Sequence, residues 1–190
     1  MFEPFINYLK LFREIPPADI TLIEQALAYR ELKEGDVLLQ SGKIARELFF
    51  VCSGVLKILS TNEKGNDVTY FFLKENQFAT ILNSFNNEVP GNETIQAACD
   101  AAVIIITRER LLKLYKTIPY LKDLITGITQ QGLINKINLK NSFLGEDAAT
   151  RYQKFLLLQP EVALRVSLSD IASYLGITQQ SLSRIRRNMK

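Results

Sequence analysis

The sequence predicts an α+β fold, in which an antiparallel β roll with flanking helices precedes a long helix and a C-terminal helix-turn-helix. Glycines at 35, 42, 54 and 65 separate short runs rich in Val, Ile, Leu, Phe and Thr. This pattern is typical of antiparallel strands joined by turns. After residue 107 the apolar residues take helical spacing. Near its end the chain has two short helical segments separated by Gly176.

Composition limits the classes of function. The chain has 190 residues, of which 47% are hydrophobic and 23% charged, and this suits one or two globular domains with a core of their own. The net charge is only +3, so any affinity for nucleic acid must come from local clustering of cations. The N-terminus lacks a signal peptide pattern, and no apolar run approaches the ~20 residues of a membrane span. We expect a cytoplasmic protein with no membrane partner.

The absence of histidine excludes several chemistries. It removes His-ligated zinc, iron and haem, and it removes Ser–His and Cys–His nucleophile pairs. Cys52 and Cys99 form no CxxC spacing, and an iron–sulfur cluster needs about four thiolates. A cupin-like enzyme is disfavoured because cupin metal sites use histidines. We expect reduced cysteines, and no enzyme activity, catalytic residue, metal or cofactor.

The elements follow in order. Residues 2–33 have helical spacing, and Pro16 and Pro17 suit the start of a helix that continues to about residue 33. Strands are expected in the apolar runs VLLQ, ELFFVC, VLKILST, VTYFFL and ETIQAACDAAVIIIT. The sequence EKGND at 63–67 predicts a hairpin turn, because Gly65 and Asn66 tolerate positive φ.

A long helix is expected from about 119 to 140. Pro119 should begin a new helix rather than interrupt one. Its apolar stripe, which includes Leu121 and Ile128, is wider than a single contact surface needs and weakens through Gly132. Periodicity leaves two interpretations open: the helix only covers the roll, or it also pairs with its twin in a dimer. Residues 141–146 (NSFLGE) read as a hinge before a helix that Pro160 ends.

The terminal segment ASYLGITQQSLSRIRR predicts a helix-turn-helix. Ser167 or Ser169 suits the cap of the first helix, Gly176 the tight turn, and Thr178 the cap of the second helix. Leu182 and Ile185 are spaced to face inward. The candidate DNA-binding residues are Thr178, Gln179, Gln180, Ser181, Ser183, Arg184 and Arg187.

These residue types suit a DNA groove. Glutamine pairs with adenine and arginine with guanine, and serine and helix N-terminal amides hold phosphates. No carboxylate follows Asp170, whereas Arg184, Arg186, Arg187 and Lys190 do. The alternatives are a structural helical hairpin or a basic tail that is only solvated.

The segment SLSDIASYLGITQQSLSRIRR resembles the helix-turn-helix of Crp/Fnr transcription regulators, especially a short-tailed group of Bacteroidetes-like genomes. GDVLLQSGKIARELFFVCSGVLKI resembles the opening of that family's cyclic-nucleotide-binding-like jelly roll. The resemblance covers nearly the whole chain. It implies base contacts from Gln179, Gln180 and Arg184, and a homodimer that pairs through the long helix, which then becomes a dimerisation helix. It also implies a sensory domain at 1–140 and a DNA-binding domain at 141–190.

The chain departs from the cyclic-AMP-binding members of that family. Those members bind the ribose with a Gly-Glu pair and the cyclic phosphate with an Arg-Ser or Arg-Thr pair. Here Ala79 follows Phe78, and Gly91 and Glu93 stand near the expected arginine. A phosphate would meet a carboxylate and no cation, so cyclic AMP is not the expected effector. The candidate pocket for an unknown small-molecule effector comprises Phe78, Thr80, Ile81, Asn92, Glu93 and Thr94.

The sequence therefore predicts a dimeric, sequence-specific DNA-binding transcription regulator of Crp/Fnr type that binds double-stranded DNA. The alternative is a ligand-binding or protein-interaction module that no longer reads DNA. A wing after the recognition helix is not expected, because that helix lies close to the last residue of the sequence.

Overall fold

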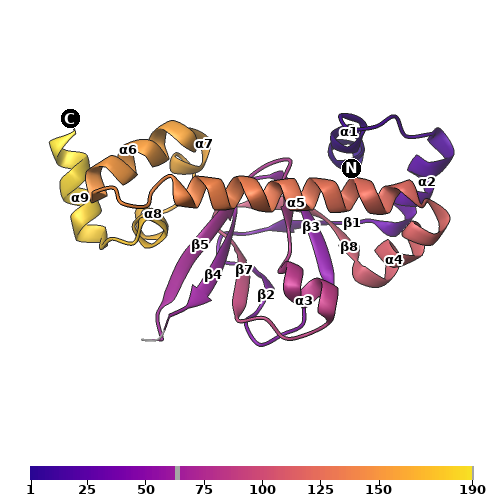
Figure 1. Cartoon of the computed structure of the whole chain (residues 1–190), viewed down its shortest axis with the longest axis horizontal. Helices are drawn as coiled ribbons and strands as arrows, with labels where there is room; N and C mark the ends of the chain where they lie inside the picture. The colour runs from indigo at the N-terminus through magenta and orange to yellow at the C-terminus, as the bar shows by residue number, and fades with distance from the viewer. Residues whose placement is uncertain (63–64, 190) are drawn as a thin grey trace.

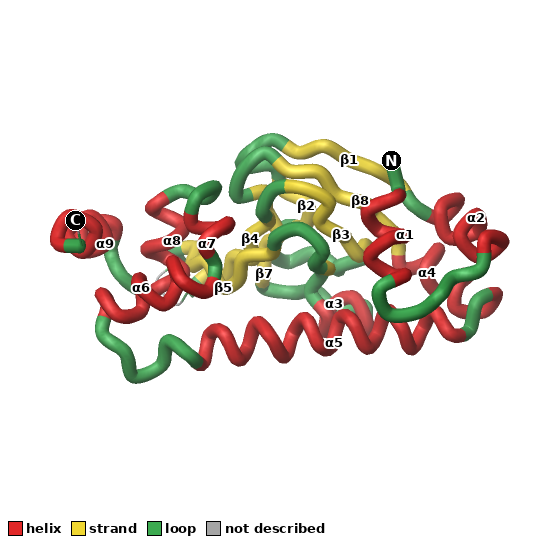
Figure 2. The backbone as a smooth tube through the Cα atoms, turned by 90° about the horizontal axis from the view of Figure 1, so that it is seen from above, coloured by secondary structure: helices red, strands yellow, loops and turns green. Residues whose placement is uncertain are grey.

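A long helix organises the molecule. The structure is a computed structural model that describes residues 1–62 and 65–189. Helix α5 (Tyr120–Asn141) runs past the β roll and the N-terminal helices, and four shorter helices lie beyond its C-terminal end (Figures 1 and 2). These four form the helical unit, residues 147–189: α6 (Ala148–Leu158), α7 (Pro160–Ala163), α8 (Leu168–Leu175) and α9 (Gln179–Asn188).

The roll consists of two four-stranded antiparallel sheets. Their strand orders are β1-β8-β3-β6 and β2-β7-β4-β5. The strands are β1 (Ala28–Leu32), β2 (Val37–Leu39), β3 (Glu47–Ser53), β4 (Leu56–Thr61), β5 (Asp67–Leu73), β6 (Phe78–Ala79), β7 (Glu93–Ala97) and β8 (Ala101–Thr107). The predicted α+β class with an antiparallel roll is confirmed.

The N-terminal region differs from the prediction. Helices α1 (Glu3–Lys10) and α2 (Pro17–Ala26) form as expected, but a helix up to residue 33 is wrong. Leu27 turns to extended backbone with ψ of 155°, and β1 pairs with β8 in a register that places Ala28 opposite Ile105. A free strand edge supplies hydrogen bonds that helical spacing alone does not reveal.

One further element of the roll differs from the prediction. The run at 93–107 forms the strands β7 and β8, with a turn at 98–100 between them. The short helix α3 (Leu82–Asn87) was not predicted. The hairpin was placed correctly: β4 pairs with β5 as far as Thr61 and Asp67, and Gly65 has φ of 78°. Its residues 63 and 64 lie outside the described part of the chain.

Aromatic rings join the N-terminal helix α1 to the core of the roll. The ring of Phe5 in α1 meets Phe50 at 5.3 Å and Phe78 at 5.9 Å, both edge to face. Such geometry is favourable beyond the area it buries. Helix α1 thereby packs against β3 and β6 of the roll.

Helix α5 changes character along its length. Pro119 is its N-cap, as predicted, and Leu121, Ile125 and Ile128 are buried against the roll together with α4 (Arg108–Thr117). Further along, Leu133, Ile134 and Ile137 remain exposed, with Ile134 at 49%. No helix among the described residues has both the length and the apolar character to cross a membrane.

A second hydrophobic core lies where the helical unit meets the roll. It joins Phe155, Tyr174 and Leu182 to the roll residues Val55 and Phe72. The predicted hinge at 141–146 is a compact turn in which Phe143 is buried and Lys154 contacts both Ser142 O (3.0 Å) and Glu146 (2.5 Å). The division of the chain at residues 140 and 141 stays a prediction.

Candidate nucleic-acid interface and effector cavity

Local capping builds the helix-turn-helix. Ser167 Oγ accepts a hydrogen bond from Asp170 N at 3.1 Å, so Ser167 caps α8. Gly176 has φ of 67°, a conformation that favours glycine, and it makes the tight turn. Thr178 Oγ1 accepts from Ser181 N at 3.1 Å and begins α9. The pattern seen in the sequence folds as predicted because each signal acts within a few residues.

Helix α9 is anchored on one face only. Leu182 is fully buried and Ile185 is partly buried against the second core. Gln179, Gln180, Ser183, Arg184 and Arg187 are exposed, and together they form what we call the recognition face.

The polar side chains of α9 divide into capping hydroxyls and arginines without internal partners. Thr178 Oγ1 donates to Ser181 Oγ at 3.0 Å, so these two hydroxyls serve the cap and Ser181 is half-buried. Arg184, Arg186 and Arg187 form no ion pair or hydrogen bond with any residue that the structure describes. Cations without internal partners, on a face that carries no carboxylate, can bind phosphates or base edges.

The opposite side of the helical unit contacts the roll through aromatic rings. Phe72 of β5 meets Tyr174 of α8 at 5.1 Å and Phe155 of α6 at 6.2 Å between ring centroids. Phe143 packs edge to face on Tyr174 at 5.9 Å. Burial of Tyr174 raises the pKa of its hydroxyl to about 12. We call this side the docking face, comprising Phe155, Arg165, Asp170, Ser173 and Tyr174.

Polar contacts fix the orientation of α8 on the roll. Lys57 Nζ of β4 lies 2.6 Å from Asp170 Oδ1 in the first turn of α8, and their side chains are only 15% and 14% exposed. Ser173 Oγ accepts from Thr69 N at 2.9 Å, so α8 also replaces a strand neighbour for β5. An ion pair this shielded depends on its geometry, because each charge has lost much of its hydration.

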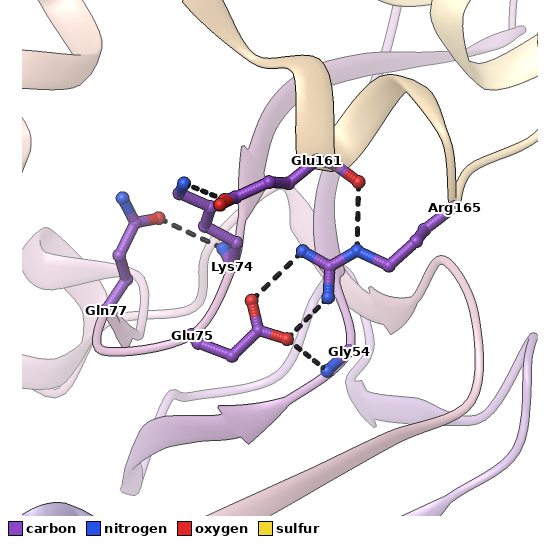
Figure 3. A network of polar contacts seen from close by, with 6 residues as sticks. All are labelled: Gly54, Lys74, Glu75, Gln77, Glu161 and Arg165. Atoms are coloured by element: carbon purple, nitrogen blue, oxygen red, sulfur yellow. Dashed lines mark hydrogen bonds and ion pairs between the residues drawn. The ribbon is translucent and has the colours of Figure 1, made fainter.

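A second ion pair joins the loop after β5 to the segment after α7 (Figure 3). Arg165 donates from Nη1 and Nη2 to the two carboxylate oxygens of Glu75, at 2.5 and 3.0 Å, and from Nε to Glu161 O at 2.9 Å. Glu75 also accepts from Gly54 N at 2.8 Å. Lys74 pairs with Glu161 beside it. This fork-shaped pairing is directional as well as strong.

The surroundings of Glu75 set its charge. Burial alone would raise its pKa, but the hydrogen bond from Arg165, backbone N–H groups and the Arg165 charge together hold the pKa below its ordinary value of 4.5. Gly54 supplies one of those N–H groups from a turn at φ of 82°, where a Cβ would meet Asp100 O at 2.3 Å. Glu75 is therefore held at a turn that accepts only glycine.

Lys140 marks the junction of α5, α8 and β5. Its ammonium donates to Tyr174 O at 3.2 Å and lies 4.5 Å from the Tyr174 ring centroid and 5.4 Å from that of Tyr70. Burial lowers the pKa of Lys140. The last turn of the long helix thus contacts both the roll and the helix-turn-helix.

A cavity of about 210 Å³ lies between the roll and α5. Four predicted pocket residues line it: Phe78, Thr80, Ile81 and Glu93. Asn92 and Thr94 do not line it, and Thr94 Oγ1 instead accepts from Ser41 N at 3.1 Å. The remaining lining residues are Leu48, Ile58, Tyr70, Phe71, Leu82 and Asn83 from the roll and Thr129, Leu133 and Lys136 from α5.

Lys136 corrects one expectation about this cavity. The prediction that an anion there would meet no cation is wrong, because Lys136 lines it from α5. Burial lowers the pKa of Lys136 to about 8. Helical periodicity could not show this, because it does not say which residues of a long helix face a particular strand.

Comparison with known proteins supports the fold. Residues 29–118 match the family model described as the cyclic nucleotide-binding domain. No curated protein sequence matches the chain.

Three solved structures share its architecture. The c-di-GMP-responsive global regulator CLP of Xanthomonas campestris is 15% identical, with 92% of this chain and 91% of that chain covered and a TM-score of 0.71. FixK2 from Bradyrhizobium japonicum is 17% identical, with 86% and 84% covered and a TM-score of 0.72. A proposed Crp/Fnr-family transcriptional regulator from Eubacterium rectale is 20% identical, with 96% and 87% covered and a TM-score of 0.72. At these identities the likeness shows the fold, and it confirms the predicted jelly roll with a helical C-terminal region.

Proposed function

We propose that this chain, which carries a cyclic nucleotide-binding domain in the fold of Crp/Fnr regulators, is a dimeric, sequence-specific DNA-binding transcription regulator. The observation that carries the proposal is the recognition face of α9. Its glutamines and arginines are exposed, and the arginine side chains form no internal pair with described residues. Thr178 caps the helix and Leu182 is buried beneath it. A regulator of this kind works in the cytoplasm, beside the DNA.

Dimerisation gives the two recognition helices a fixed separation. The second half of α5 exposes Leu133, Ile134 and Ile137, and a second α5 is the occupant that this stripe suits. Two copies paired there present two α9 helices to one face of DNA. A duplex read by such a dimer has half-sites about 34–36 Å apart, which is one helical turn.

We also propose that the roll cavity responds to an effector other than cyclic AMP. Glu93 lines the cavity. Among the described residues that line the cavity, Lys136 is the one cation, and it belongs to α5 rather than to the strands. A cyclic phosphate would approach the carboxylate without the forked arginine that binds phosphate best. Neither cyclic AMP nor c-di-GMP should raise the melting temperature of the protein. A clear increase with either nucleotide would contradict this part of the proposal.

The DNA-binding proposal is tested by selecting genomic DNA fragments with the purified protein at fixed salt. A Gln179→Ala/Gln180→Ala/Arg184→Ala variant serves as the comparison. The native protein should enrich a roughly palindromic site and the variant should not, although both melt at the same temperature. Equal, unspecific retention by both would contradict base reading by α9 and favour a ligand-binding or protein-interaction module.

A further inference from the structure

We infer that Glu75 and Arg165 act as a clamp that sets which half-site spacing the dimer accepts. The inference rests on the proposed function and deepens it. It assigns a positioning role to two residues that lie outside α9 and are not among the candidate DNA-binding residues. The clamp joins the loop after β5 to the segment between α7 and α8 through two parallel hydrogen bonds.

The clamp lies at the start of the helix-turn-helix. Arg165 precedes Ser167, the cap of α8, and Arg165 Nε also binds Glu161 O in α7 at 2.9 Å. Any rotation of the helical unit against the roll therefore displaces the guanidinium from Glu75. A planar fork tolerates such rotation poorly, because both of its hydrogen bonds lose their alignment together.

Glu75, the member of the clamp that belongs to the roll, is also held in place by its own loop. Glu75 accepts from Gly54 N at 2.8 Å, and Asn76 beside it holds φ of 63°. Lys74 N donates to Gln77 Oε1 at 3.1 Å within the same loop. The carboxylate is thus fixed to the β3–β4 turn and does not follow a moving partner.

Strand β5 makes several of the contacts between the helical unit and the roll. Phe72 and Thr69 of β5 contact α8, whereas Phe71 of the same strand lines the cavity. Paired α5 helices would fix the two rolls relative to each other, and the clamp adds a directional contact to those that hold each helical unit on its roll. The distance between the two recognition helices then depends on the clamp, while base reading by one α9 helix does not.

This separation of roles gives the test. The probes are synthetic duplexes that carry two copies of the selected half-site at a series of separations, and one duplex that carries a single half-site. Native protein is compared with Glu75→Gln, Arg165→Gln and the double variant. Glu109→Gln, which removes the exposed ion pair to Lys113, is the matched control.

The native protein and Glu109→Gln should prefer one separation. The clamp variants should lose about tenfold of that preference, an effect of ordinary size for coupling between sites. Their preference for the correct half-site sequence should not change. The double variant should do no more than either single variant, because both remove the same contact.

Two results would overturn the clamp. One is an unchanged spacing preference in variants that melt normally, and the other is equal loss of spacing and half-site preference, which indicates general disruption. Arg165→Lys keeps the charge without the fork and should show an intermediate preference, so it tests the inference even if Arg165→Gln folds poorly. Failure of the native protein to bind any half-site would overturn the proposed function together with the clamp.

Discussion

The two sides of the helical unit use their charged side chains differently. On the docking side, which meets the roll, three residues of the unit each form an ion pair with a roll residue: Asp170 with Lys57, Glu161 with Lys74 and Arg165 with Glu75. On the recognition side, Arg184, Arg186 and Arg187 pair with no described residue. Paired charges fix an arrangement within the chain, whereas exposed and unpaired cations are available to an anionic partner. Changes on the docking side should therefore alter stability and the placement of the helical unit, and changes on the recognition side should alter the reading of DNA bases.

The largest effect is expected from the aromatic contact of the docking side. Phe72→Ala removes a buried ring that touches Phe155 and Tyr174, and it should lower the free energy of unfolding by about 3–5 kcal/mol. Urea unfolding measures this. Leu164→Ala, at an exposed residue of the same unit, should change it by less than about 0.5 kcal/mol. Equal effects of the two would mean that the aromatic contact does not hold the unit in solution.

The shielded ion pair should give the next effect. Lys57→Met leaves the Asp170 carboxylate without its partner in a place that is 14% exposed, and it should cost about 3 kcal/mol of unfolding free energy. Lys113→Met breaks an ion pair on the open surface of α4 and should have no measurable effect. Thermal unfolding of both variants checks the contrast, and similar melting temperatures would refute it.

On the recognition side, Arg184→Ala should weaken binding to the selected site by about 1–3 kcal/mol, the usual value of one base-reading contact. Binding to unrelated DNA should change little, so sequence preference falls. Titrations of selected and scrambled duplexes at one salt concentration measure both. A uniform loss on the two duplexes would assign Arg184 to phosphate instead of base edges.

Arg187→Ala should lower the affinity for selected and unrelated duplexes by similar factors. If Arg187 contacts phosphate, its loss weakens binding to all duplexes and lowers the slope of log affinity against log salt by about 1. Affinity measured across a salt series gives that slope. An unchanged slope would place Arg187 outside the DNA contact.

The smallest of the expected effects is the loss of unfolding free energy at acidic pH when Glu75 is protonated. The pKa of Glu75 is lower in the folded protein than its ordinary value of 4.5. The stability it contributes is therefore complete above that value, and it is lost as the pH falls below it and through the folded-state pKa. Glu75→Gln should show a shallower loss of stability over this acidic range. Parallel curves for native protein and variant would show that Glu75 does not contribute this pH dependence.

The recognition side could be predicted from the sequence, and most of the docking side could not. Thr178, Leu182 and Arg184 lie within one helix and its cap, so local signals predict the capping hydroxyl, the buried side chain and the exposed one. Glu75 and Arg165 are 90 residues apart, and no local pattern links them. Strand β1 was mistaken for helix because its partner β8 is equally remote, and Lys136 was missed because only the packed structure shows which side of α5 faces the cavity.

The most direct test measures two arginine variants side by side, Arg184→Ala and Arg165→Gln. For each, the free energy of unfolding is determined, together with the affinity for a single half-site and for duplexes that carry two half-sites at a series of separations, under the same conditions. The account predicts that Arg184→Ala keeps native stability and loses half-site affinity. It predicts that Arg165→Gln is less stable, keeps half-site affinity and loses spacing preference. Loss of stability in Arg184→Ala with unchanged DNA binding would contradict the assignment of α9 as the DNA-reading helix.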